Sequence, residues 1–226
     1  MTDPFYFMQM LSSISRKPYV KTMLSDLCCY HRKTYFHSLH VAMLSVQIGD
    51  RIGLSESRLY TLAEGALIHD IGKVKIPIRI LDSPEPLTDD DFAVIRRHPL
   101  FSYDRIHNVK QDHSLIVELI GLMHHFYANG SGYPSPGEMP PGIEYDRTPL
   151  EAKIVCIADI YDAMVSVRSY KDSYSDEFAV SELFKMVNEG KADPKSVAIL
   201  DELIYKDELI LRHAGSLNKR FISKST

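Results

Sequence analysis

Several residue types and patterns are scarce in this chain of 226 residues. It has no tryptophan, and no apolar run approaches the roughly 18 residues of a membrane helix. The nearest candidate, SLIVELIGLM, is interrupted by Glu118. The N-terminus, MTDPFYFMQM, has no basic region ahead of an apolar stretch, so no secretory signal is visible. These absences argue against a membrane association and lead us to expect a cytoplasmic location.

Cysteine, basic charge and strand patterns are scarce as well. The three cysteines show no CxxC spacing, and an odd number of thiols fits a reducing compartment. The formal charge of −4 provides no basic field, which argues against a nucleic acid polymer as partner. The single strand candidate, KVKIPIRIL, is broken by Pro77. What remains is one sizeable globular domain.

Apolar positions at helical spacing run through most of the chain, and they predict an all-α fold. One helix closes at Gly53, which suits a C-cap. Another starts at Thr88, where Asp91 stands in the position of a capping box, and ends near a proline at residue 99. A third starts with Thr148 as N-cap and Pro149 as first helical residue. Further helices are predicted over residues 57–72, 114–125, 176–189 and 194–213.

One long segment, residues 129–149, interrupts this helical pattern. It contains four glycines and five prolines, and a loop of that length inside a compact domain is usually functional or disordered. Two histidines, His124 and His125, stand just before it. Neighbouring side chains on a helix point about 100° apart, so such a pair packs poorly against one apolar face. The pair and the loop together are a candidate functional site.

Polar side chains suited to metal binding recur near the ends of the predicted helices. They are His37, His69, Asp70, His98, His124, His125 and Asp159. Inward-facing histidines and carboxylates from several helices build the metal sites of helical bundles, and a set of N and O donors without thiolate favours Fe, Mn or Zn. Any one of these histidines alone is better explained as a capping or surface residue, whereas the whole set favours two metal ions bridged by an aspartate. The remaining histidines are best explained as surface or supporting residues: His31, His40, His107, His113 and His213.

Two segments in order, HDIGKVKIP at residues 69–77 and HH followed by NGSGYP up to residue 134, resemble the HD-GYP domain. This is a bacterial branch of the HD metal-dependent phosphohydrolases, and the resemblance extends over about residues 33–203. It implies an HD-domain helical bundle with a long Gly/Pro-rich GYP loop. We therefore expect a short N-terminal helical segment at 1–30, an HD-GYP domain at 31–213 and a flexible polar tail at 214–226.

The resemblance also implies roles for individual residues. The same seven residues become the metal ligands, and Asp70 becomes the carboxylate that bridges two divalent ions, Fe or Mn. Lys73 joins Asp70 in catalysis and also contacts the substrate, because it lies about one helical turn away. Arg168 and Lys171 become contacts to the substrate phosphates. Tyr133 either binds the substrate, by stacking on a purine or by a hydrogen bond, or belongs to a structural turn that covers the core.

The implied activity is hydrolysis of cyclic di-GMP to linear pGpG, and on to GMP, with a hydroxide that bridges the two metals. Two alternatives remain open. One is a catalytically weak receptor that binds a cyclic dinucleotide, or a protein partner such as a diguanylate cyclase, at the GYP loop. The other is an enzyme for a different cyclic dinucleotide, such as cyclic GMP–AMP. For any of these functions, we expect the protein to be regulated by a partner, by formation of a homodimer or by its expression level.

The chain departs from the family pattern at five positions. Phe126 replaces a glutamate next to the ligand pair, which would weaken support for the metals. Asn129 replaces an aspartate, and we expect little effect there. Lys33 stands where members with a third metal carry a carboxylate, so two metals are predicted. His40 stands in place of an arginine, and Ser169 in place of a proline.

Overall fold

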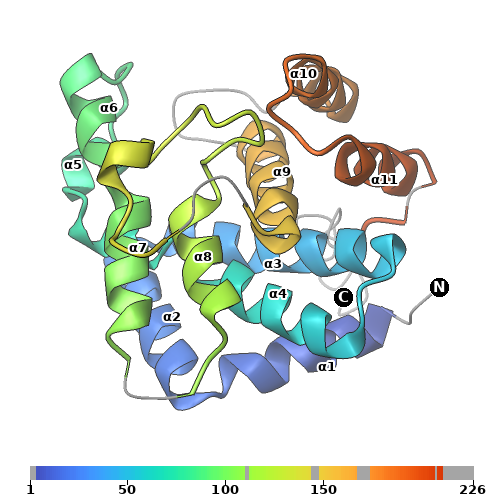
Figure 1. Ribbon diagram of the computed structural model, residues 1–226, viewed down its shortest axis with the longest axis horizontal. Coiled ribbons are helices and arrows are strands. Elements are labelled where there is room, and N and C mark those ends of the chain that lie inside the picture. The colour runs from blue at the N-terminus through green and yellow to red at the C-terminus, as the bar shows by residue number, and fades with distance from the viewer. Residues whose placement is uncertain (1–3, 110–111, 144–147, 167–173, 207, 211–226) are drawn as a thin grey trace, which may run out of the picture.

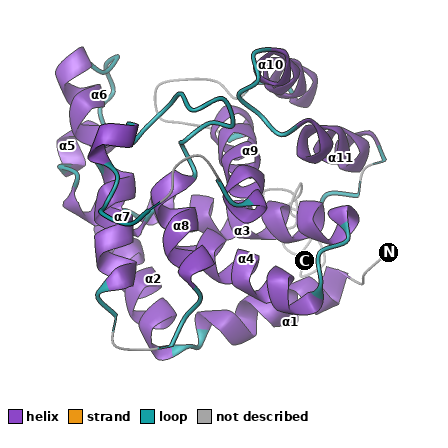
Figure 2. Ribbon diagram, in the orientation of Figure 1, coloured by secondary structure: helices purple, strands orange, loops and turns teal. Residues whose placement is uncertain are grey.

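The computed structural model describes residues 4–109, 112–143, 148–166, 174–206 and 208–210. Within these residues every regular element is a helix, which confirms the predicted all-α fold (Figures 1 and 2). The α-helices are α1 (Pro4–Ser15), α2 (Pro18–Tyr30), α3 (Arg32–Ile52), α4 (Glu56–Ile68), α5 (Ile78–Leu81), α6 (Asp89–Ile95), α7 (His98–His107), α8 (Leu115–Met123), α9 (Leu150–Val165), α10 (Asp176–Asn188) and α11 (Pro194–Tyr205). Two short 3-10 helices are η1 (Ile71–Lys75) and η2 (Pro136–Glu138).

Helix α3 forms the centre of the molecule. It packs against α2, α4, α9 and α11, and every residue from 41 to 49 is buried. A helix that is buried on all sides has no polar face, which explains the apolar and small residues of this stretch. Helices α5 and α6 lie on the opposite side of the molecule from α10 and α11 (Figure 1). The central position of α3 lets residues of one helix face both α4 and α9.

The predicted helix signals are mostly found where the sequence places them. Gly53 caps α3 with a φ of 91°, a conformation that glycine adopts without strain. Thr88 and Asp91 form the predicted capping box at the start of α6. Helix α9, however, starts at Leu150 with Pro149 as N-cap, because Pro149 has the extended ψ of 147°. The prediction of Thr148 as N-cap was therefore wrong by one residue.

The helix predicted to end at Pro99 is two helices in the structure. Helix α6 ends at Ile95, and α7 begins at His98. Pro99 lies in the first turn of α7, where its missing N–H has no intrahelical partner to lose. His98 therefore opens a helix rather than closing one. The last helix, α11, ends at Tyr205, short of the predicted residue 213, and residues 211–226 lie outside the described part.

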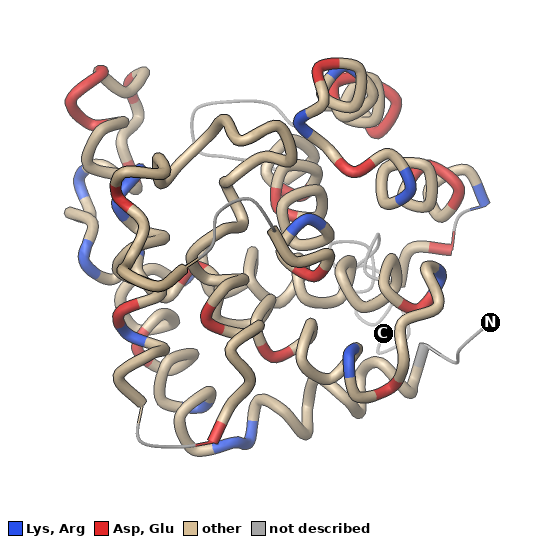
Figure 3. The backbone as a smooth tube through the Cα atoms, viewed as in Figure 1, with Lys and Arg blue, Asp and Glu red and all other residues tan. Residues whose placement is uncertain are grey.

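The N-terminal helices belong to the same hydrophobic core as the rest. Phe7 and Met10 of α1 and Leu27 of α2 are buried in the cluster that contains the apolar side chains of α3 and α4. Basic and acidic residues are scattered over the described helices, and charges of both signs occur on either side of the molecule (Figure 3). None of the described helices combines the length and apolar character that a bilayer crossing requires.

Candidate metal centre

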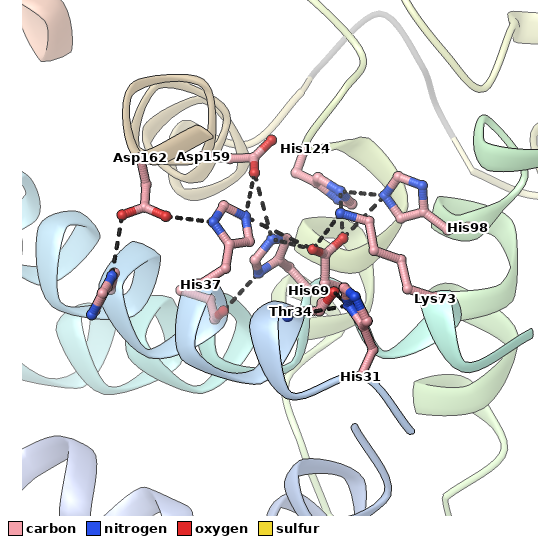
Figure 4. Close-up of polar contacts among 12 residues, drawn as sticks. His31, Thr34, His37, His69, Lys73, His98, His124, Asp159 and Asp162 are labelled. Carbon is pink, nitrogen blue, oxygen red and sulfur yellow. Dashed lines mark hydrogen bonds and ion pairs between the residues drawn. The ribbon is translucent and has the colours of Figure 1, made fainter. Parts of the chain in front are cut away.

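The seven predicted ligands converge from five helices that are far apart in the chain. His37 comes from α3, His69 and Asp70 from the end of α4, His98 from the start of α7, His124 and His125 from the end of α8, and Asp159 from α9. Figure 4 shows five of them with their side chains turned toward one another: His37, His69, His98, His124 and Asp159. Four of the seven line a cavity of about 560 Å³: His37, His98, His125 and Asp159.

Asp70 lies between two groups of histidines. Its Oδ2 atom is 3.8 Å from Nε2 of His37 and 3.5 Å from Nε2 of His69. Its Oδ1 atom is 3.2 Å from Nε2 of His98 and 3.9 Å from Nε2 of His124. Each carboxylate oxygen therefore faces a different group, which is the arrangement that a carboxylate bridging two cations requires.

Asp159 connects the same two groups from the opposite side. Its Oδ1 atom is 2.7 Å from Nε2 of His37, and its Oδ2 atom is 3.7 Å from Nε2 of His125. The donor atoms of His37, His69 and Asp70 lie within 4.8 Å of one another. The donor atoms of His98, His124 and His125 satisfy the same limit. The centre thus offers two adjacent sets of three donors, with Asp159 reaching both.

Three of the histidines are oriented by the same backbone contact. Their Nδ1 atoms lie within 3.1 Å of a carbonyl oxygen one helical turn earlier: His69 contacts Ala66, His98 contacts Ile95, and His124 contacts Ile120 and Gly121. A carbonyl only accepts, so Nδ1 carries the proton and Nε2 keeps its lone pair for a metal.

His37 is oriented by a carboxylate, Asp162, that the sequence interpretation did not assign to the site. Nδ1 of His37 lies 2.6 Å from Oδ2 of Asp162, and Nδ1 of His40 lies 3.3 Å from Oδ1. A metal ligand held by a carboxylate behind it is a common arrangement in metalloproteins. The signal was present in the sequence, since Asp162 follows Asp159 by three residues and His40 follows His37 by three.

An Asp162→Asn substitution should weaken metal binding by about 10- to 100-fold, as losses of such supporting carboxylates do. The asparagine fills the same space and can still accept from Nδ1 of His37, but it lacks the negative charge that strengthens this contact. Metal affinity measured by competition with a chromophoric chelator tests this. His40→Ala is the matched control, because it leaves the contact of Asp162 with His37 in place. Equal affinity in the Asp162→Asn variant and the wild type would contradict the role.

Charge and burial place these groups in the protonation states that metal ligands need. Burial opposes ionisation of Asp70, but Lys73 and the neighbouring histidines hold its pKa well below the usual range. Burial also opposes ionisation of Asp159, but His37 and the other histidines beside it hold its pKa well below the usual range. Burial lowers the pKa of His125 to about 3 and that of His124 well below its ordinary value. The carboxylates are thus anionic and these imidazoles neutral at pH 7.

His37 differs from the other histidines in its protonation. Burial lowers its pKa, but the hydrogen bonds to Asp159 and Asp162 outweigh burial and raise the pKa to about 9. In this arrangement Nε2 of His37 is protonated and donates a hydrogen bond to Oδ1 of Asp159. A cation held by both side chains would replace that proton, so its binding would release a proton and strengthen as the pH rises.

Two buried atoms at the middle of the centre show that the donor set fits a metal. Nε2 of His69 and Oδ1 of Asp70 are fully buried and have no hydrogen-bond partner among the described residues. Buried polar atoms are nearly always paired, so one unpaired atom on the side of each of the two groups fits a donor set that could hold cations. Imidazole and carboxylate donors without thiolate suit Fe, Mn or Zn.

The GYP loop folds back onto the ligand pair. Gly132 has a φ of 94°, and a Cβ atom there would lie 2.1 Å from the carbonyl oxygen of His125, so only glycine fits. The N–H of Tyr133 donates to the same oxygen at 3.0 Å. The ring of Tyr133 lies 4.6 Å from that of His125, and its side chain lines the cavity. Tyr133 thus covers a predicted ligand and also faces the cavity.

The other residues singled out from the sequence divide into three groups. Lys73 lines the cavity, with Nζ 2.6 Å from Oδ2 of Asp70. Asn129 anchors the GYP loop, because its side chain accepts from Ser131 N–H and donates to the carbonyl of Glu189. Phe126 is 3% exposed, belongs to the hydrophobic core and does not line the cavity. Three more lie outside the described residues: Arg168, Ser169 and Lys171.

The remaining histidines have structural partners in the described part of the chain. His31 is the N-cap of α3 and is buried. His107 and His113 each lie 2.9 Å from a carboxylate oxygen of Glu118, which explains how α8 buries a charged residue. His213 lies outside the described residues. These positions agree with the interpretation of His31, His107 and His113 as surface or supporting residues, although His31 is not on the surface.

The sequence and the fold were compared with those of known proteins. The sequence model of the HD domain family matches residues 13–196. The chain is 35% identical over 162 residues to the cyclic di-GMP phosphodiesterase response regulator RpfG of Xanthomonas campestris, covering 71% of this chain and 40% of that protein. It is 32% identical over 185 residues to the 3'3'-cGAMP-specific phosphodiesterase 2 of Vibrio cholerae, covering 81% of this chain and 34% of that protein. The chain thus spans less than half the length of these relatives.

A solved structure shares the fold. The HD-GYP-type protein Bd1817 of Bdellovibrio bacteriovorus superposes with a TM-score of 0.60 at 21% identity, covering 76% of this chain and 52% of that one. At this level of identity the likeness concerns the helical architecture alone.

Proposed function

This chain belongs to the HD domain family, in its HD-GYP branch, and from that premise we propose that it is a metal-dependent phosphodiesterase that hydrolyses cyclic di-GMP to linear pGpG. The observation that carries the proposal is the position of Asp70, whose two oxygens face two separate groups of histidines. The relatives named for cyclic di-GMP and cyclic GMP–AMP hydrolysis support the substrate class.

The chemistry follows from the donor set and the cavity above it. When bound, two divalent ions, Fe or Mn in this proposal, supply Lewis acidity to the attacking water and to a phosphate oxygen. Asp70 and Asp159 hold the two halves of the centre at a fixed separation. The Nζ atom of Lys73, anchored on Asp70, offsets the negative charge that a bound phosphodiester brings. Tyr133 closes the cavity beside His125.

The size of the cavity fits the proposed substrate. Its volume of about 560 Å³ lies within the roughly 300–1,000 Å³ of small-molecule sites. Histidine and carboxylate side chains line its inner end, and apolar side chains such as Leu87 and Ile95 line its walls. A dianionic cyclic dinucleotide with two planar bases needs both kinds of surface.

Anaerobic reconstitution with Fe²⁺ or Mn²⁺ tests the proposal directly. The reconstituted protein should contain two metal ions per chain and convert cyclic di-GMP to pGpG, whereas chelator-treated protein should not. Re-addition of the metal should restore the activity. An absence of turnover with Fe, Mn, Co and Ni would refute the proposal.

Cyclic GMP–AMP is the second candidate substrate, because one relative is named for it. A comparison of kcat/KM for cyclic di-GMP and 3'3'-cyclic GMP–AMP separates the two activities. We also propose a cytoplasmic location and regulation through a homodimer or a protein partner, such as a diguanylate cyclase, at the GYP loop. Size-exclusion chromatography with light scattering, with and without the partner, tests the last point.

A Lys73→Ala substitution should lower kcat by about 10²- to 10³-fold, as losses of a single electrostatic contact to a reacting oxygen do. The substitution removes the positive charge nearest to Asp70 inside the cavity. Steady-state kinetics on the reconstituted protein measure the effect. Lys75→Ala is the matched control, because Lys75 is exposed and its Nζ packs over the ring of Phe101. Equal losses in both variants would contradict the assignment.

A further inference from the structure

The cavity of the metal centre continues beyond the ligands, along the N-terminal part of α3. A second group of side chains lines this outer end: Lys33, Phe36, Ile80, Leu81, Asp82 and Leu87. None of them belongs to the predicted ligand set. Lys33 precedes the ligand His37 by four residues, so the outer group lies about 6 Å further along the helix axis.

Asp82 is the one carboxylate among these outer side chains. It lies at the C-terminal end of α5, and its Oδ1 atom is 2.6 Å from Nζ of Lys33 and 3.3 Å from Nε2 of His31. His31 is itself fixed by its contact with Thr34 at 2.6 Å, on the first turn of α3 (Figure 4). Both contacts of Asp82 use Oδ1, so Oδ2 has no partner among the described residues. The pair with Lys33 also neutralises a charge that would otherwise repel an anionic ligand.

Phe36 provides an aromatic surface at the same end. Its side chain is 44% exposed, although it precedes a metal-ligand candidate and lines the cavity. The guanidinium carbon of Arg32 lies 5.5 Å from the centre of its ring. An exposed aromatic ring on a cavity wall is a stacking surface for a planar base.

A cyclic dinucleotide must reach this outer end. Only one of its two phosphodiester groups can occupy the metal centre at a time. Both nucleosides adjoin that group, one through O3' and the other through O5', so their bases extend away from it to different parts of the cavity. The direction along α3 is lined by the stacking ring of Phe36 and the acceptor of Asp82. Bases are commonly read in this way, by stacking and by hydrogen bonds to their Watson–Crick edges.

We propose that Phe36 and Asp82 form a guanine-binding subsite, in which the base stacks on Phe36 and donates from its Watson–Crick edge to the carboxylate of Asp82. The inference rests on the proposed function. Guanine presents two neighbouring donors on that edge, N1–H and the N2 amino group. Adenine presents one donor and, at N1, a lone pair that a carboxylate repels. The subsite therefore selects a cyclic dinucleotide that contains at least one guanine.

The mixed substrate 3'3'-cyclic GMP–AMP can reveal which base occupies the subsite. Its two phosphodiester bonds differ, because one follows guanosine and the other follows adenosine. If guanine occupies the outer subsite, one particular bond lies at the metals. Addition of water then breaks that P–O3' bond and leaves a 5'-phosphate and a 3'-hydroxyl. One of the two linear isomers, pGpA or pApG, should therefore dominate.

The experiment compares the reconstituted wild type with Asp82→Ala and Phe36→Ala on cyclic di-GMP, cyclic di-AMP and 3'3'-cyclic GMP–AMP. The wild type should prefer guanine-containing substrates and form one isomer from the mixed one. Asp82→Ala should lower kcat/KM for cyclic di-GMP by about 10- to 100-fold, change that for cyclic di-AMP little, and yield both isomers. Phe36→Ala should raise KM for all three substrates by about tenfold, with little change in kcat.

Two controls separate recognition from structure. Asp26→Ala removes a carboxylate of similar exposure, paired with Arg105 away from the cavity, and should change nothing. Lys33→Met breaks the ion pair of Asp82 but keeps the acceptor, so it should keep the preference for guanine and the single isomer. If the wild type turns over and the Asp82→Ala variant keeps the same substrate selectivity and isomer ratio, the subsite alone is overturned. No wild-type turnover of any of the three substrates would overturn the proposed function and the subsite with it.

Discussion

An Asp70→Ala variant is expected to bind fewer than two metal ions per chain and to lose phosphodiesterase activity by a factor of about 10³ or more, as when a central catalytic group is removed. The reason is the position of Asp70 between the two histidine groups, with one oxygen toward each. Alanine removes both oxygens at once, so neither group keeps its shared donor. It also leaves Lys73 without its anchor in the cavity.

Metal analysis of the anaerobically reconstituted protein, together with a cyclic di-GMP hydrolysis assay, checks this result. Asp70→Asn provides a graded comparison, because its amide has a single oxygen and should retain one ion rather than two. Circular dichroism and thermal unfolding establish that both variants fold. Two bound ions and wild-type turnover in the alanine variant would show that Asp70 does not bridge the centre.

A Phe126→Glu variant, which restores the residue usual in this family, is expected to destabilise the protein by about 3–5 kcal/mol, the range for losing a large buried apolar side chain. The side chain of Phe126 is 3% exposed and packs in the hydrophobic core. A glutamate there would bury a carboxylate in the hydrophobic core, which adds to the loss. The variant should therefore gain no metal affinity.

Equilibrium unfolding in urea measures the change in the free energy of unfolding. Phe92→Glu on α6 is the matched control, because Phe92 is 45% exposed and surface substitutions usually change stability by no more than about 0.5 kcal/mol. A Phe126→Glu variant with unchanged stability and tighter metal binding would show that the glutamate can support the centre. It would also support the alternative function, a catalytically weak receptor.

The position of Phe126 changes the interpretation of this departure from the family. From the sequence, its loss of a carboxylate beside His124 and His125 suggested weaker support for the metals. In the structure the histidines are oriented by other groups: His124 by backbone carbonyls, and His37 by Asp162. The orientation of His124 and His37 therefore does not depend on a carboxylate at position 126.

The local signals in the sequence were sufficient for the helices and for the ligand types. The capping box at Thr88 and the C-cap at Gly53 depend on a few neighbouring residues, so they can be recognised without a structure. Motif order likewise indicated the seven candidate ligands. The sequence misplaced the end of α6, because a proline stops one helix and starts another with equal ease.

The sequence by itself determined the all-α class, the approximate helices, and a set of histidines and aspartates suited to two metal ions. Only the tertiary structure decided that Asp70 faces two histidine groups, that Asp162 orients His37 and that Asp82 lies beside Lys33. Asp162 and His37 are 125 residues apart, and Asp82 and Lys33 are 49 apart. Helix periodicity tells which side chains share a face of one helix, whereas the packing of α3 against α4 and α9 determines which faces meet.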